Sequence, residues 1–81
     1  MEKTAFLKAI QSIRSTDNQN LRSRVIDLLN DSDNEVRRGA IEATRNLFSA
    51  LEEETLLRPV LNKETDPRNT ALLHLYIGRG Q

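Results

Sequence analysis

Residues 28–40 read Leu28-Leu29-Asn30-Asp31-Ser32-Asp33-Asn34-Glu35-Val36-Arg37-Arg38-Gly39-Ala40. A short acidic and polar turn here separates two segments whose apolar residues recur at helical spacing, so this stretch decides the fold class. Either Asp33 or Asn34 can cap the second helix, and Asp33 also gains from the positive end of the helix dipole. The stretch therefore predicts two neighbouring helices joined by a tight turn.

Helical spacing continues on both sides of this turn. We expect five helices: at about 3–14, 20–30 and 35–50, one that opens at the acidic run 52–54 and contains Pro59, and one over 67–77. Pro59 should kink or split the fourth helix, because proline removes a backbone donor. Asp66 followed by Pro67 predicts a capped start of the fifth helix.

The apolar stripes predict which side chains face inward. In the third helix the main stripe ends at Leu47 and Leu51, and in the fifth helix the inward set is Ala71, Leu72, Leu75 and Tyr76. Gly39 lies inside the third helix, where glycine costs about 1 kcal/mol relative to alanine. Close approach of another helix and simple tolerance explain this glycine equally well.

The turn motif of Leu28-Leu29, Asp31, Asp33, Val36-Arg37 and Ala40 resembles the inter-helix signature of HEAT-like repeats of the PBS-lyase type, over residues 25–47. The resemblance implies a short α-solenoid of about five antiparallel helices. It implies structural roles for the motif: Asp31 and Asp33 as turn and cap residues, and Arg37 as a residue that packs its stem along the neighbouring helix and bonds carbonyls or the Asp of an adjacent repeat.

Two other junctions are compared with this motif. The junction at Asp17 has the same order of acid, an aliphatic-Arg pair and then Val25, whereas no Val-Arg pair follows Asp66-Pro67. Members of this family serve as scaffolds, partner-docking modules, helpers of chromophore lyases and occasionally binders of DNA lesions. Fold resemblance does not choose among these roles.

Composition limits the class of protein. The 81 residues are enough for a single domain, 1–81, and 12 basic residues balance 12 acidic ones. Neutral charge gives no overall attraction to nucleic acid or to an anionic membrane. The absence of cysteine excludes disulfides and thiolate metal sites, and the apolar runs are too short to span a membrane. We expect a cytoplasmic protein without a cofactor.

Candidate sites are few. His74 is the only histidine, and a lone histidine is a poor metal site. Asp31, Asp33 and Glu35 do not form a calcium loop, because Val36 stands where an EF-hand needs glycine. No nucleophile motif or phosphate loop is present, so we expect no catalytic residues.

Arginines concentrate in the middle of the chain, and they define an alternative function. On stacked helices they could line a phosphate-binding face, but Asp27, Glu35 and Glu42 are interleaved with them, which favours solvated, salt-bridged helix surfaces. The candidate nucleic-acid contacts of this alternative are Arg22, Arg24, Arg37, Arg38 and Arg45.

The sequence therefore predicts a small protein–protein interaction module, an adaptor, regulator or assembly factor without catalysis. A further alternative is an accessory subunit of an enzyme, such as a bilin-lyase-like helper. Open apolar ends of a short helical array predict a homodimer. The candidate interaction surface comprises Phe6, Leu7 and Ile10 of the first helix with Leu72, Leu73 and Tyr76 of the last.

Overall fold

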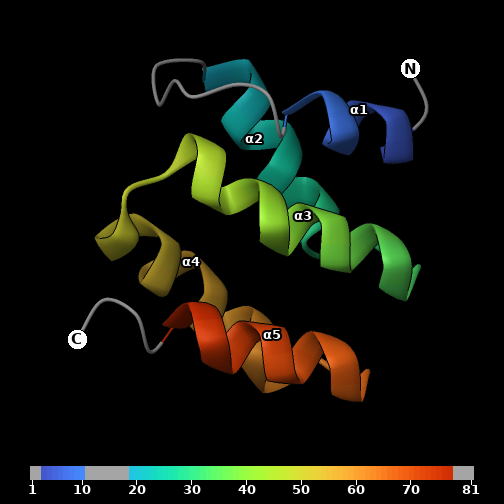
Figure 1. Ribbon diagram of the computed structural model, residues 1–81, viewed down its shortest axis with the longest axis vertical. Helices are drawn as coiled ribbons and strands as arrows, with labels where there is room; N and C mark the ends of the chain where they lie inside the picture. Colours follow the sequence, from blue (N-terminus) through green and yellow to red (C-terminus); the bar gives the residue numbers. More distant parts are fainter. Residues whose placement is uncertain (1–2, 11–18, 78–81) are drawn as a thin grey trace.

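The computed structural model describes residues 3–10 and 19–77, and all structural statements below concern these residues. Their regular secondary structure is entirely α-helical, which confirms the all-α class (Figure 1). The helices are α1 (Lys3–Ile10), α2 (Gln19–Leu28), α3 (Asn34–Leu47), α4 (Ala50–Lys63) and α5 (Pro67–Ile77). The expected end of the first helix at Ile13 and Arg14, and the junction at Asp17, lie outside the described residues.

One layer of the fold contains α1, α3 and α5, which lie side by side with α3 in the middle (Figure 1). Lys3, at the start of α1, donates to Asp31 just before α3. Asn34, at the start of α3, donates to Asp66 just before α5. Because each of these contacts joins the N-terminal ends of two neighbouring helices, α1, α3 and α5 run in the same direction.

A second layer contains α2 and α4. Arg22 near the start of α2 pairs with Glu52 near the start of α4, and Asn30 after α2 bonds Lys63 at the end of α4. These two links show that α2 and α4 also run parallel to each other. Successive helices from α2 to α5 thus alternate between two layers and reverse direction at each turn.

The helices close on one another. The radius of gyration is 11.6 Å, as expected for a compact domain of this length. The accessible surface is 4997 Å², and a folded monomer of this mass exposes about 5,000 Å². The chain therefore forms a compact body and not an extended array.

The middle helix supplies much of the core, because α3 packs against each of the other four helices. Its buried residues are Val36, Ala40, Ile41, Ala43, Thr44 and Leu47. Gly39 lies where α1 crosses closest: a Cβ atom at this position would lie 2.9 Å from Cδ1 of Leu7. The packing of Leu7 therefore favours glycine at this position, since an alanine would require the end of the Leu7 side chain to move.

The boundary between the third and fourth helices differs from the expectation. α3 ends at Leu47, and α4 begins at Ala50, because Ser49 and Glu52 form a capping box. The backbone N–H of Ser49 and the guanidinium of Arg22 lower the pKa of Glu52. The prediction that Leu51 belongs to the inward stripe of the third helix is wrong, since this side chain is 76% exposed on α4.

Pro59 does not split the fourth helix. α4 is one continuous helix from Ala50 to Lys63, with Pro59 exposed inside it. The freed carbonyl of residue 55 lies on the water-facing side, where solvent can satisfy it.

The face that α5 turns towards the core also differs from the expectation. Ala71 and Leu75 are exposed, whereas Leu73 and Ile77 are buried with Tyr76. From Ala71 to Ile77 the segment is apolar except for His74, so its periodicity does not determine which face is buried. A polar contact provides the missing constraint: buried Asn69 donates from Nδ2 to the backbone carbonyl of Asn34 at 3.0 Å.

Among the helices in the described ranges, none combines the length and the apolar character needed to cross a bilayer.

Candidate functional site

The turn between α2 and α3 is built on two aspartates. Oδ1 of Asp31 accepts a hydrogen bond from the backbone N–H of Asp33 at 2.9 Å, and Oδ1 of Asp33 caps α3 by accepting from Glu35 N–H at 2.8 Å. Oδ2 of Asp31 accepts from Nζ of Lys3 at 2.6 Å. The Lys3 ammonium, together with the Asp33 N–H, lowers the pKa of Asp31.

The turn between α4 and α5 repeats this pattern. Oε2 of Glu64 accepts from the backbone N–H of Asp66 at 3.0 Å, and Oδ1 of Asp66 accepts from Arg68 N–H at 2.8 Å at the start of α5. The Arg68 N–H and the Asn34 amide lower the pKa of Asp66. The same 33-residue step relates Asp31 to Glu64 and Asp33 to Asp66.

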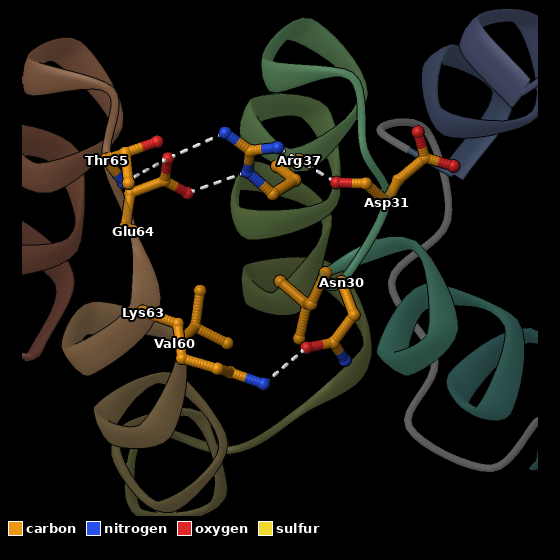
Figure 2. A pocket seen from close by; sticks show the side chains of 8 residues that line it. Asn30, Asp31, Arg37, Val60, Lys63, Glu64 and Thr65 are labelled. Carbon is orange, nitrogen blue, oxygen red and sulfur yellow. Dashed lines mark hydrogen bonds and ion pairs between the residues drawn. The ribbon is translucent and has the colours of Figure 1, made fainter.

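A bidentate ion pair connects the two turns. Arg37 donates from Nε to Oε1 of Glu64 at 2.9 Å and from Nη2 to Oε2 at 2.8 Å (Figure 2). Its Nη1 donates to the backbone carbonyls of Asp31 at 2.9 Å and Ser32 at 3.1 Å. The Glu64 side chain is 0% exposed and that of Arg37 17%, so water has little access to the pair. Their mutual hydrogen bonding lowers the pKa of Glu64 and raises the pKa of Arg37.

Both turns thus share one architecture. The first acid of each turn binds a cation from the preceding helix of its layer, Lys3 for Asp31 and Arg37 for Glu64. The acid-x-Asp spacing before each helix is the sequence signal for this repeat. In this alignment Ala40 corresponds to Leu73, and both are fully buried.

A polar cavity of about 340 Å³ lies between the two turns (Figure 2). Nζ of Lys63 donates to Oδ1 of Asn30 at 2.8 Å across this cavity. The residues that line it are Leu29, Asn30, Asp31, Arg37, Val60, Lys63, Glu64 and Thr65. Arg37 and Glu64 are bonded to each other, Asp31 is bonded to Lys3, and Lys63 is bonded to Asn30, so the cavity has the character of a structural junction.

A second depression, which we call the α2–α4 groove, is almost entirely apolar and has a volume of about 440 Å³. It is lined by Arg22, Ile26, Phe48, Leu51, Glu52, Thr55 and Leu56. Ile26 is 36% exposed and Leu51 76%, which are high values for large aliphatic side chains. The sequence reasoning missed this groove, because it assigned Leu51 to the buried stripe of the wrong helix.

The five candidate arginines are not arranged as a phosphate-binding face would require. Three of them lie over aromatic rings: Arg22 over Phe48, Arg24 over Phe6 and Arg45 over Tyr76, at 4.5, 4.4 and 3.5 Å from the ring centroids. Each of these guanidiniums is thus packed against an aromatic face of the protein itself.

The remaining two arginines do not form a cationic patch either. Arg37 is held by Glu64, and Arg38 is half-buried on α3.

The candidate interaction surface at the ends of the chain is largely internal. Phe6, Leu7 and Ile10 of α1 and Leu73 and Tyr76 of α5 are buried, and Leu72 is half-buried. The expectation of open apolar ends is therefore wrong for these residues, because α1 and α5 turn their apolar faces onto α3 and α4.

The remaining candidates fit no ligand site. His74 is exposed on α5. Oxygens of Asp31 and Asp33 already accept from backbone N–H groups and from Lys3. No group of three or more potential metal ligands occurs among the described residues.

Comparisons of this chain with protein-family models, with curated proteins and with solved structures find no match in any of the three.

Proposed function

We propose that this protein is a small protein–protein interaction module, a short HEAT-like helical stack without catalysis of its own. The observation that carries the proposal is the α2–α4 groove, where Ile26 and Leu51 leave apolar surface open on an otherwise compact body. Exposed aliphatic side chains that lie together beside an apolar depression suit the binding of another molecule better than isolated ones do.

The two equivalent turns support the HEAT-like part of the proposal. In a repeat protein each unit contacts its neighbours through the same set of bonds. Here Lys3 bonds Asp31 and Arg37 bonds Glu64, so each link joins a cation near the start of one helix to the first acid of the next turn of the layer. The two links are similar and not identical, since the 33-residue step from Lys3 leads to Val36, one position before Arg37. These links hold the helices of the first layer together. In the second layer, the Arg22–Glu52 pair and the Lys63–Asn30 bond hold α2 next to α4, which preorganises the groove for a partner.

Binding of nucleic acid through the arginines has less support. Nonspecific binding depends on several cations that neutralise phosphates together. Arg22, Arg24 and Arg45 lie over three different rings, and Arg37 is engaged by a buried carboxylate. Titration with a duplex oligonucleotide at low and moderate salt tests this alternative, which requires an affinity that falls steeply with salt.

Site-specific photo-crosslinking in the native cells tests the proposed function. A photoreactive residue at Thr55, which is exposed and lines the groove, should give discrete protein adducts that disappear when Leu51→Asp is added. The matched control is the same photoreactive residue at His74, exposed on α5. Adducts of equal yield from both positions, or none from Thr55, would contradict a docking role for the groove.

A further inference from the structure

Two of the most exposed large aliphatic side chains among the described residues lie together. Three large aliphatic side chains are markedly exposed: Ile26, Leu51 and Leu75. Ile26 and Leu51 line the α2–α4 groove, whereas Leu75 lies on α5 outside it. Any occupant that gains from burial of apolar area therefore has most to gain at the groove.

The groove combines a projection and a hollow on the same patch. Leu51 stands at its edge with 76% of its surface exposed, and Phe48 and Leu56 line the depression beside it. A two-fold interface uses the same patch on both subunits, and such a patch must be complementary to itself. A leucine beside an apolar hollow meets this requirement, because each copy can insert its leucine into the hollow of the other.

The charges of the patch are also self-complementary. Its charged lining residues are one cation and one anion, Arg22 and Glu52, which pair at 2.7 Å. Apposing the patch to a copy of itself brings no excess of either sign into the interface, so no unpaired charge has to be desolvated. The net charge of the whole chain is zero, so two copies do not repel each other at long range.

We propose that the occupant of the α2–α4 groove is a second copy of this chain, in a symmetric dimer in which Leu51 of each copy lies between α2 and α4 of the other. This inference rests on the proposed function, since it names the partner of the same groove. It places the dimer interface on Ile26, Phe48, Leu51 and Leu56, and not on α1 and α5.

Sedimentation equilibrium over a hundredfold concentration range tests the dimer with three proteins: the wild type, Leu51→Asp and the control Leu75→Asp. The wild type should rise from 9.3 kDa towards twice that mass. Leu51→Asp should weaken the association at least about tenfold, as expected for a charge in an apolar interface. Leu75→Asp removes a leucine that is also mostly exposed, and it should associate like the wild type.

Both substituted side chains are mostly exposed, so the variants should keep the fold. The helix dipole favours an aspartate near the start of α4 and opposes one in the last turn of α5, by about 1 kcal/mol at most for exposed positions. Circular dichroism of each variant verifies that the fold is kept. A constant mass of 9.3 kDa for the wild type, or equal losses for the two variants, would overturn the dimer.

Cysteine pairing gives a second test, because the chain has no cysteine of its own. Oxidation of a mixture of Ile26→Cys and Leu51→Cys proteins should give a crosslinked heterodimer, and a mixture of Leu75→Cys and Leu51→Cys should give much less. Equal yields from the two mixtures contradict the proposed contact. A wild type that stays monomeric while the Thr55 photo-crosslinker captures a different protein would reject the dimer and retain the proposed function. A monomer with no adducts would reject both.

Discussion

Arg37 holds both carboxylate oxygens of Glu64, at 2.9 and 2.8 Å, and so fixes the first turn of α3 to the residue that caps the end of α4. The same guanidinium bonds the carbonyls of the preceding turn. One side chain thus joins three segments of the chain, and most of its partners are shielded from water.

Replacing Arg37 should therefore be far more damaging than replacing its neighbour. Arg37→Ala leaves the Glu64 carboxylate buried without its cation, and we expect a loss of about 2–4 kcal/mol in the free energy of unfolding. Arg38→Ala removes a half-buried side chain that makes no ion pair with any described residue, and should cost under about 1 kcal/mol. Urea denaturation of both variants measures the difference, and equal midpoints would show that the Arg37–Glu64 pair contributes nothing.

Acid should destabilise the fold partly through Glu64. Because Arg37 lowers the pKa of Glu64 in the folded state, the unfolded chain binds this proton at higher pH than the folded chain. The stabilisation by ionised Glu64 is therefore present above the pKa of about 4.3 that this group has in the unfolded chain. It is lost as the pH falls through the lower pKa of Glu64 in the folded state. Glu64→Gln should flatten the fall in unfolding free energy between about pH 5 and pH 3.

Some acid sensitivity should remain in Glu64→Gln, since the pKa values of Asp31, Glu52 and Asp66 are also lowered. Denaturant titrations at a series of pH values provide the measurement, with Glu42→Gln, on the adjacent helix α3, as the control. The role assigned to Glu64 would be refuted if Glu64→Gln and the wild type lost stability in parallel.

The effect of Gly39→Ala should depend on Leu7. In the wild type, the gain of about 1 kcal/mol in helix propensity is opposed by the 2.9 Å approach to Cδ1 of Leu7, so we expect a net change near zero. In a Leu7→Ala background the opposing contact is absent, and Gly39→Ala should stabilise by about 1 kcal/mol. A double-mutant cycle from thermal unfolding measures this coupling. Additive effects would mean that α1 does not approach α3 at this glycine.

Ser49→Ala should destabilise by about 1 kcal/mol, because it removes one half of the capping box that starts α4. Ser23→Ala, in an exposed position inside α2, should be neutral or slightly stabilising, since alanine is the better helix former. Chemical denaturation distinguishes the two. If Ser49→Ala were as mild as Ser23→Ala, the helix boundary at Ser49 would be in error.

The helical elements could be predicted from the sequence because turn chemistry and helical period agree along much of the chain. Local residue type limits the cap of α3 to Asp33 or Asn34, and the structure has Asp33. The inward positions Val25, Leu28, Val36 and Leu47 follow from spacing. Local signals of this kind need no knowledge of what lies across the fold.

Contacts between distant residues could not be predicted in this way. Nothing near Arg37 in the sequence identifies Glu64 as its partner, and the rotation of α5 depends on Asn69 meeting the Asn34 carbonyl. The α2–α4 groove was missed because the capping box at Ser49 moves Leu51 from the inner side of one helix to the outer side of the next.

The central position of α3 has a consequence for how the molecule opens. Every other helix packs against it, so the release of any helix exposes part of α3, although α4 and α5 also pack closely on each other. Longer repeat arrays can fray one unit at a time, but here α3 is the part of the core that all the other helices share. Amide protons of Ile41 and Thr44 should therefore exchange with solvent only when the entire domain unfolds, and their exchange rates should report its global stability.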